Sequence, residues 1–405
     1  MNAQNNILWI IAESFYPEGN GTGYQLTSLA IELSKKYRIK VITTLPDTLL
    51  NEKKNLHEQY HEIYIHRIRV AYFDRNKLPF RIINIIIHSI KLFWVILKEM
   101  HRADKVLVVS NPPTLPFIVL MASKIIPVEV DLLLYDLYPE ALAAVDVVSA
   151  NSFSYKVLYF VSQWLFRKVH KIVVLGRDMQ ELLVRKQQCL QSKICLIPNW
   201  AETTLIIPHN IAQNIILKKF NLLDKFVFQY SGNIGRTHNI EAIYELAKAS
   251  ESIKNLHFLI IGEGAKKKWL DQALSAHPLS NVTTHTFFSN DLRCEVQNAA
   301  NVAIISFIQG MSGISVPSRM YNMMAAGKPI LAIVDSNSEV AMTIKEEKIG
   351  WVIPSNKPLD ALPIILNIMN NRDMVLDMGC RARKLAESKF SINNAADKYL
   401  KMFNS

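Results

Sequence analysis

Short apolar runs alternate with amphipathic segments along almost the whole chain, and this alternation predicts parallel sheets with helices on both faces. In the first half, the runs predict strands near residues 7–12, 39–43, 63–70, 105–109, 128–135, 171–175 and 193–197. In the second half, they predict strands near residues 226–230, 257–261, 282–288, 302–306, 329–333 and 351–353. Each half therefore predicts one doubly wound α/β domain.

The pattern weakens between the two halves. After the tetrapeptide IPNW, the alternation is lost until about Asp224 and then restarts. A chain of 405 residues also exceeds the size at which one hydrophobic core stops growing. We therefore expect an N-terminal domain over residues 1–200, a linker over 201–224 and a second domain from 225 onward. Because ligands bind beyond the carboxyl ends of parallel strands, the site is predicted in the cleft between two facing domains.

One segment, RIINIIIHSIKLFWVILK at residues 81–98, has an apolar length close to that of a membrane span. Its polar residues share one helical stripe, which consists of Arg81, Asn84, His88, Lys91 and Lys98. So many polar residues argue against a membrane span. Two compatible interpretations stay open: a helix packed against the sheet, or one whose exposed apolar flank lies in a membrane surface beside basic side chains.

Charge and composition narrow the classes of partner. The chain is 50% hydrophobic and 20% charged, as in an ordinary globular protein, and its formal net charge is +11. Residues 1–200 hold 24 Lys and Arg against 17 Asp and Glu. A basic excess favours anionic partners, and since no nucleic-acid module is found, we expect phosphate and anionic lipid but no nucleic acid. The four scattered cysteines and the lack of signal-peptide features at residues 1–11 predict a cytoplasmic location.

The first candidate motif is AESFYPEGNGTGYQLTSLA, at residues 12–30. Gly19, Gly21 and Gly23 lie between a predicted strand and a helix that is expected to begin near Tyr24. Glycines there would let backbone N–H groups approach a phosphate or a sugar. The spacing differs from G-x-G-x-x-G, so it does not support a nicotinamide cofactor. The alternative is an ordinary turn.

A second motif, YSGNIGRTHNIEAI at residues 230–243, has the same order of strand, glycine-rich loop and helix. Its loop adds Arg236 and His238 to Gly232 and Gly235. A fixed guanidinium beside backbone amides would stabilise the charge that develops on a diphosphate leaving group. The alternative is a surface arginine.

The third motif, SVPSRMYNMMAAGKPILA at residues 315–332, predicts the start of a helix, its end and the following strand. Ser318 and Asn322 are four residues apart and therefore share a helix face. Arg319 lies in the first turn, where the helix dipole does not favour a cation. A bound phosphate would explain an arginine at this position.

These stretches, together with LYDLYPEAL, IPNW and LIIGEGAKK, run through the chain in the order found in retaining glycosyltransferases of family 4. The sequence resembles most the bacterial members that build O-antigen, capsule and colanic acid. The resemblance implies the GT-B fold, with two Rossmann-like domains facing across a cleft. It also implies that the second domain ends near residue 385 and that a C-terminal helix at 386–405 returns toward the first domain.

The resemblance further implies a reaction. The donor would be a nucleotide sugar, with uridine diphosphate as the expected carrier. The acceptor would be a polyprenyl-diphosphate-linked saccharide, with the enzyme peripherally attached to the inner face of the cytoplasmic membrane. We expect no cofactor and no catalytic metal, since no D-x-D triplet follows a strand. Basic loops would neutralise the diphosphate instead.

Residue roles follow from the same resemblance. Catalytic roles are implied for Asp136 and Arg236. Acceptor-side or phosphate-loop roles are implied for Gly19, Gly21, Gly23 and Glu140. The implied donor-binding residues are Gly232, Asn233, Gly235, His238, Gly262, Glu263, Gly264, Ser312, Gly313, Ser315, Ser318, Arg319 and Asn322.

Position 322 departs from the family. The broad pattern E-x7-E would put acids at 314 and 322, whereas the subgroup resembles V-P-S-K-x-Y-E; here Asn322 replaces the second acid and Arg319 replaces the Lys. An amide oxygen accepts a ribose hydroxyl more weakly than a carboxylate does. A non-catalytic relative therefore stays an alternative. A sugar-nucleotide epimerase is a second one, although it would need an acid in the loop at 310–316, which has none.

Overall fold

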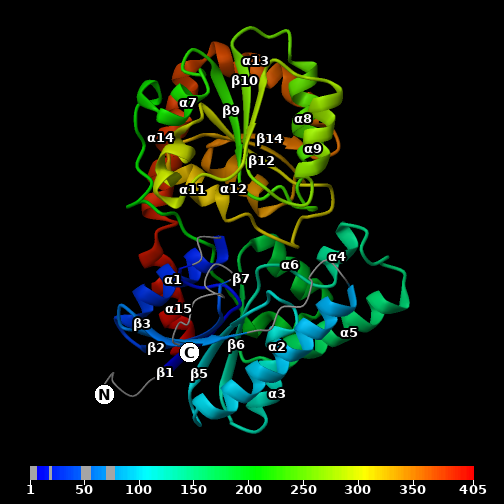
Figure 1. Ribbon diagram of the computed structural model, residues 1–405, viewed down its shortest axis with the longest axis vertical. Helices are drawn as coiled ribbons and strands as arrows, with labels where there is room; N and C mark the ends of the chain where they lie inside the picture. The colour runs from blue at the N-terminus through cyan, green and yellow to red at the C-terminus, as the bar shows by residue number, and fades with distance from the viewer. Residues whose placement is uncertain (1–6, 18–20, 47–55, 70–77) are drawn as a thin grey trace. The chain divides into compact units, whose positions relative to one another are not determined.

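The computed structural model describes residues 7–17, 21–46, 56–69 and 78–405 (Figure 1). The chain forms two compact units, each of which is described by itself. Unit 1 comprises Met1–Pro139, Ala150–Pro198 and Ala395–Ser405, and unit 2 comprises Glu140–Ser149 and Asn199–Asn394.

Unit 1 contains an eight-stranded sheet in the order β3-β4-β2-β1-β5-β6-β7-β8. Its central strands are buried apolar runs, so their side chains are covered on both faces, as in a parallel doubly wound sheet. The strands are β1 (Ile7–Ile11), β2 (Arg38–Thr44), β3 (His57–Tyr60), β4 (Ile63–Ile68), β5 (Lys105–Val109), β6 (Glu129–Leu133), β7 (Ile172–Val174) and β8 (Ile194–Leu196).

Strand β3 was absent from the sequence prediction. It pairs antiparallel with β4, with His57 opposite His66 and Tyr60 opposite Ile63. Its sequence HEQY has no apolar run, because an edge strand needs to cover only part of one face. Cross-strand pairing rather than local pattern therefore decides this element.

The helices of unit 1 fill the crossovers between strands. Among them, α2 contacts α3, and α3 contacts α5, so these three helices lie side by side (Figure 1). The helices are α1 (Gly21–Ser34), α2 (Leu78–Glu99), α3 (Leu115–Ser123), α5 (Phe153–Lys168), α6 (Arg177–Lys186) and the 3-10 turn η3 (Gln188–Lys193).

The C-terminal helix α15 (Ile392–Phe403) begins in unit 2 and continues into unit 1. In unit 1, the Tyr37 hydroxyl donates to the Asn404 side-chain oxygen at 3.0 Å, and the Tyr37 ring meets Phe403 edge to face. The Lys105 ammonium donates to the Phe403 carbonyl. The end of the chain is thus part of the first core.

Unit 2 contains a six-stranded, fully parallel sheet in the order β11-β10-β9-β12-β13-β14. Every residue of β9, β10, β12 and β13 is buried, so these strands form the centre of the core. The strands are β9 (Phe226–Ser231), β10 (Leu256–Ile261), β11 (Val282–His285), β12 (Val302–Ser306), β13 (Ile330–Val334) and β14 (Gly350–Pro354). Two Rossmann-like units confirm the predicted α/β fold class.

Helices of unit 2 begin at polar caps that the sequence supplies. Asn239 accepts the Ala242 N–H at 3.1 Å to start α8, and Ser338 accepts the Ala341 N–H at 3.3 Å to start α12. The helices are α4 (Glu140–Ala144), α7 (Ile215–Lys219), α8 (Ile240–Ala249), α9 (Lys267–Ala276), α10 (Arg293–Asn298), α11 (Arg319–Ala325), α12 (Glu339–Glu347), α13 (Ala361–Asn370) and α14 (Arg372–Ser388), with 3-10 turns η4 (Ile211–Gln213), η5 (Asn290–Leu292) and η6 (Pro358–Asp360).

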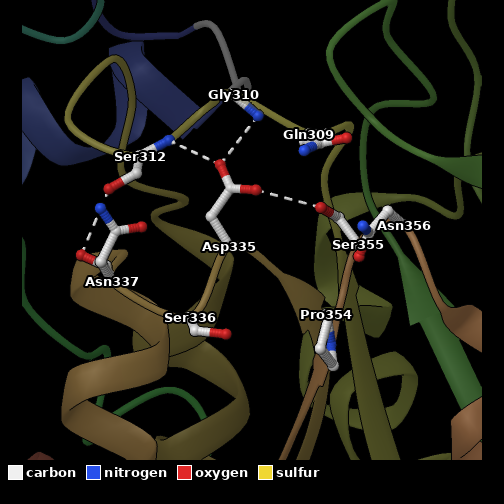
Figure 2. A pocket seen from close by; sticks show the side chains of 9 residues that line it. All are labelled: Gln309, Gly310, Ser312, Asp335, Ser336, Asn337, Pro354, Ser355 and Asn356. Atoms are coloured by element: carbon white, nitrogen blue, oxygen red, sulfur yellow. Dashed lines mark hydrogen bonds between the residues drawn. The ribbon is translucent and has the colours of Figure 1, made fainter.

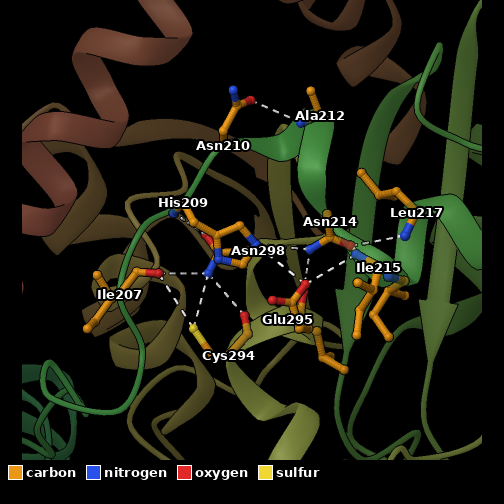
Figure 3. Close-up of polar contacts among 12 residues, drawn as sticks. Ile207, His209, Asn210, Ala212, Asn214, Ile215, Leu217, Cys294, Glu295 and Asn298 are labelled. Atoms are coloured by element: carbon orange, nitrogen blue, oxygen red, sulfur yellow. Dashed lines mark hydrogen bonds and ion pairs between the residues drawn. The ribbon is translucent and has the colours of Figure 1, made fainter.

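The stretch that we expected to be a linker lies within unit 2 in the structure. Figure 3 shows the polar contacts that join this stretch to Glu295 and Asn298. Fully buried Asn214 accepts the N–H groups that open α7 and donates to the Glu295 carbonyl at 2.8 Å. Asn298, also fully buried, donates to the Ile207 carbonyl and accepts the His209 N–H. Hydrogen-bonded side-chain amides take buried positions here that apolar residues would otherwise occupy. For this reason the alternation of apolar and amphipathic segments is not seen in the sequence of this stretch.

Candidate functional site

The sheet of unit 2 has a topological switch point between β9 and β12. From β9, the chain passes outward to β10 and β11, and it then returns to β12 on the other side of β9. The loop after β9 and the loop after β12 therefore leave the sheet at one crevice, where ligands of doubly wound sheets bind. The second and third sequence motifs meet at this place.

Glycines allow the loop after β9 to lie directly on the loop after β10. A Cβ on Gly262 would lie 1.9 Å from the Gly232 carbonyl oxygen, and one on Gly264 would lie 2.5 Å from the Asn233 side-chain oxygen. Both loops also exchange backbone hydrogen bonds, with the Ile234 N–H donating to Glu263 at 2.7 Å. Gly262 and Gly264 are thus required by loop packing, and the nucleotide contact that we predicted for them stays a prediction.

A guanidinium from α11 is fixed against the same loop. Nη2 of Arg319 donates to the Asn233 carbonyl at 3.1 Å and lies 2.8 Å from Nε2 of His238. The guanidinium stacks over the Tyr230 ring, 4.7 Å from its centroid. A Cβ on Gly232 would lie 2.9 Å from its Cζ, so the missing side chain provides the space for it. The sequence analysis included Arg319 among the residues expected to bind the sugar donor. It did not show that the Arg319 side chain contacts Tyr230 of β9 and the loop that follows this strand.

His238 lies deep in this loop. Its ring stacks on Phe307 with centroids 5.0 Å apart, and its Nδ1 lies 3.2 Å from the Gly235 amide nitrogen. Burial, and then the charge of Arg319, hold the pKa of His238 well below its ordinary value. The side chain is therefore neutral at neutral pH.

Arg236 and Asn322 are placed differently from Arg319. Arg236 is exposed and makes no ion pair with any residue of the described ranges. Asn322 is half-buried on α11, and within those ranges its side-chain amide makes no hydrogen bond. Ser318 precedes the first residue of α11, but its hydroxyl does not cap the helix. The carboxylate of Glu263 is exposed.

The loop after β12 is held by a carboxylate that sequence reasoning missed. Asp335, the first residue after β13, accepts the N–H groups of Gly310 at 2.9 Å and Ser312 at 3.1 Å (Figure 2). Its other oxygen accepts the Ser355 hydroxyl at 3.0 Å. These two backbone N–H groups therefore already have an acceptor within the protein. An acid directly after a strand was the signal that could have located Asp335.

An open pocket of about 400 Å³ lies beyond the carboxyl ends of β12, β13 and β14 (Figure 2). Of the predicted donor-binding residues, it contains Ser312, whose hydroxyl donates to the Asn337 carbonyl at 3.2 Å. Gly313 is buried with φ +76° and Ser315 is half-buried, and neither lines the pocket. The lining is polar: Gln309, Gly310, Ser312, Asp335, Ser336, Asn337, Pro354, Ser355 and Asn356.

The predicted residues of unit 1 are distributed over several elements. Gly19 lies outside the described residues, and Gly21 and Gly23 are the first and third residues of α1. The helix thus starts three residues earlier than Tyr24, the start that we had predicted, because glycines are tolerated where a helix begins. Asp136 follows β6, and its N–H lies 3.5 Å from the Ser110 hydroxyl at the end of β5. Glu140 begins α4, which belongs to unit 2.

The long apolar segment forms α2, and its polar stripe does not face solvent as a whole. Asn84 is buried, and burial lowers the pKa of His88 below its ordinary value. The Lys91 ammonium is exposed and donates to the Arg69 carbonyl at 2.8 Å. Outward lie four apolar side chains at helical spacing: Ile83, Ile86, Ile90 and Trp94. Among the described residues, no helix has the length and apolarity needed to cross a bilayer.

One group of side chains within the described ranges has the donor atoms and spacing to hold a metal ion. The ligand atoms of His57, His66 and Glu99 lie within 4.8 Å of one another. His66 and Glu99 are already paired through Nδ1 and Oε1 at 3.2 Å, and His57 is exposed. The group belongs to unit 1 and includes no predicted catalytic residue.

Comparisons with known proteins agree with this geometry. Residues 213–385, a segment of unit 2, match the family described as "Glycosyl transferases group 1". The probable glycosyltransferase WbjE of Pseudomonas aeruginosa is 32% identical over 266 residues, which make up 64% of this chain and 64% of that relative. The chain thus aligns with slightly less than two thirds of that relative's length.

Two solved structures share the fold. WaaG, a glycosyltransferase involved in lipopolysaccharide biosynthesis, superposes with a TM-score of 0.69 at 14% identity, covering 98% of this chain and 99% of that one. Alr3699/HepE of Anabaena in complex with UDP and glucose superposes with a TM-score of 0.74 at 13% identity, with the same coverage. At such identities the likeness shows the fold alone, and it confirms the predicted GT-B class.

Proposed function

We propose that this protein is a retaining glycosyltransferase of family 4, which transfers a sugar from a uridine-diphosphate donor to a polyprenyl-diphosphate-linked saccharide. The observation that carries the proposal is the loop after β9, where a fixed guanidinium and glycine backbone meet at the switch point of unit 2. A diphosphate is the leaving group whose growing charge such donors stabilise. The glycosyltransferase match over residues 213–385 and the UDP-bound HepE structure support the choice of donor.

In the proposed reaction, the bond between the anomeric carbon and the diphosphate oxygen breaks first. The acceptor hydroxyl then attacks the same face of the sugar, and its proton passes to the departing diphosphate. Arg319 would stabilise the diphosphate from α11, exposed Arg236 could close onto it, and the Asn322 amide could accept a ribose hydroxyl hydrogen bond. Asp136 would face the reacting sugar. No metal is assigned a role in this proposal.

The donor is tested by thermal unfolding of the purified protein with UDP, GDP, dTDP, CDP and NAD. A ligand at about a hundred times its dissociation constant adds about 2.7 kcal/mol of stability. We expect stabilisation by UDP alone, and transfer from a UDP-sugar to a lipid-linked acceptor. Stabilisation by another nucleoside diphosphate would reassign the base, and binding of NAD alone would overturn the proposed class.

We also propose that unit 1 attaches to the surface of an anionic membrane, where the lipid-linked acceptor would be. The exposed apolar side chains of α2, which are Ile83, Ile86, Ile90 and Trp94, belong to the same helix as exposed Lys98. The neighbouring helices α3 and α5 add further exposed apolar side chains. On α5, Phe153 is 81% exposed and Phe160 is 67% exposed, and since they are seven residues apart, the two rings lie on the same side of the helix. Apolar side chains flanked by lysines are typical of helices that lie in a lipid interface.

The membrane proposal is tested with vesicles that contain phosphatidylglycerol. The triple variant Ile86→Ser, Ile90→Ser and Trp94→Ser should sediment with vesicles much less than the wild type. The matched control replaces three exposed leucines of unit 2, Leu359, Leu366 and Leu376, with serine and should behave like the wild type. Equal sedimentation of both variants would show that α2 is only a structural helix. UDP affinity should remain unchanged in both.

The alternative of a non-catalytic relative is motivated by Asn322. Such a protein would bind UDP weakly or not at all and would form no product in the transfer assay. The epimerase alternative would require a carboxylate that is free to remove a proton. Asp335 is the acid that contacts the loop after β12, but its oxygens already accept three hydrogen bonds.

A further inference from the structure

His238 lies between two hydrogen-bond donors, although a neutral imidazole accepts only one hydrogen bond. The Gly235 N–H points to its Nδ1 at 3.2 Å, and Nη2 of Arg319 points to its Nε2 at 2.8 Å. The contact with Arg319 is shorter and is assisted by charge, which favours the tautomer with its proton on Nδ1. In that tautomer the Gly235 N–H gains no acceptor from His238.

The surroundings of His238 oppose a second proton on the ring. Arg319 faces it from α11, and Lys266 from the loop after β10 donates to the His238 carbonyl at 3.0 Å. The nearby carboxylate of Glu241, on α8, forms an ion pair with the Lys266 ammonium, with Oε2 and Nζ 2.9 Å apart. The remaining neighbours are the rings of Tyr230 on β9 and Phe307 after β12. Burial and these two cations keep His238 neutral.

We propose that neutral His238 is a positioning residue, which holds the Arg319 guanidinium on the loop after β9 so that Arg319 binds the donor diphosphate. The inference rests on the proposed nucleoside-diphosphate donor and names the groups that hold it. A proton on Nε2 would replace the acceptor of Arg319 with a second cation, and the guanidinium would leave its position.

Donor affinity is expected to fall in acid. Above the pKa of His238 the ring is neutral and the guanidinium is held, so donor affinity is full. As pH falls through that pKa, the ring gains a proton and donor affinity is lost. UDP itself also gains a proton near pH 6, because the second pKa of a phosphate is about 6. The informative quantity is therefore the difference between wild type and a variant that cannot titrate.

The experiment measures UDP binding calorimetrically from about pH 8 down to the lowest pH at which the wild type stays folded, because burial holds the pKa of His238 well below its ordinary value. His238→Gln can place an amide oxygen near the former Nε2, so it should bind UDP within about threefold of the wild type at pH 7.5 and lose less affinity in acid. Arg319→Ala should bind UDP about 10- to 100-fold more weakly at every pH. Arg319→Lys keeps the positive charge but loses the planar guanidinium with its several N–H donors. Its UDP affinity should therefore lie between those of the wild type and Arg319→Ala. Arg372→Ala, an exposed arginine on α14, is the matched control and should bind like the wild type.

The outcomes separate the two proposals. If the wild type binds no nucleoside diphosphate at any pH, the proposed donor is wrong. If it binds UDP but His238→Gln shows the same pH profile as the wild type, His238 does not position the site. UDP binding that is weakened by Arg236→Ala and unaffected by Arg319→Ala would also overturn the inference. Unfolding temperatures of all variants, measured in the same buffers, identify any that lose their fold.

Discussion

The two glycine-rich loops of this protein have the same order of strand, glycines and helix in the sequence, but the structure uses their glycines differently. After β1, Gly21 and Gly23 belong to the first turn of a helix. After β9, the glycines at 232 and 235 stay in a loop that Arg319 and the loop after β10 hold in place. Equal patterns thus do not imply equal roles, because contacts with residues distant in the sequence hold the loop after β9 in place.

The largest effect should come from filling the contact between the loops after β9 and β10. Gly262→Ala places a methyl group 1.9 Å from the Gly232 carbonyl oxygen, and backbone atoms cannot move aside easily. We expect a loss of about 3 kcal/mol in the free energy of unfolding, measured with urea. Gly310→Ala is the control, since a Cβ there meets nothing within 4 Å and costs only about 1 kcal/mol for its φ of +86°. Equal losses would mean that loop packing is not what requires Gly262.

The next effect should follow removal of the carboxylate that anchors the loop after β12. Asp335→Ala leaves the N–H groups of Gly310 and Ser312 without their acceptor, and we expect about 2 kcal/mol of destabilisation together with weaker UDP binding. Asp373→Ala, in the exposed first turn of α14, should cost about 0.5 kcal/mol and leave binding unchanged. If both variants unfold at the same urea concentration, Asp335 does not anchor the loop.

The substitution Asn322→Glu should have a smaller effect, and it should strengthen UDP binding. A carboxylate accepts a ribose hydroxyl more strongly than an amide, so UDP should bind about fivefold more tightly, as measured by calorimetry. Asn367→Glu, at an exposed position on α13, controls for the added charge. Unchanged or lost affinity in Asn322→Glu would remove this residue from the ribose site.

The smallest effect should be found in the loop after β1. Gly21 is exposed at the start of α1, so Gly21→Ala should stabilise unit 1 by at most about 0.5–1 kcal/mol by reducing the freedom of the unfolded chain. UDP affinity and transfer rate should not change. A drop in transfer rate with unchanged stability would show instead that a substrate approaches the backbone at Gly21.

Most of the fold could be predicted from local pattern. Each predicted strand is present, and β5 and β12 have the predicted bounds, because buried parallel strands are continuous apolar runs. The prediction failed where pairing or buried polar groups replace apolar residues, as in β3 and in the segment around Asn214. The sequence also placed Asn84 and His88 on one helical stripe without showing that both are affected by burial, since residue spacing specifies a helix face but not the direction in which that face points.

The sequence by itself determined the class of fold, the position of the loops after β9 and β12, and the presence of Arg319 and Asn322 near them. These features depend on residues close together in the chain. Tertiary structure decided that Arg319 crosses 86 positions to reach Asn233, that Asp335 holds Gly310 and Ser312, and that His238 stays neutral. The contacts of Arg319 and Asp335 join loops that follow different strands of one sheet, so residue spacing within a short stretch does not predict them. The charge of His238 depends on its burial, which is also a property of the tertiary structure.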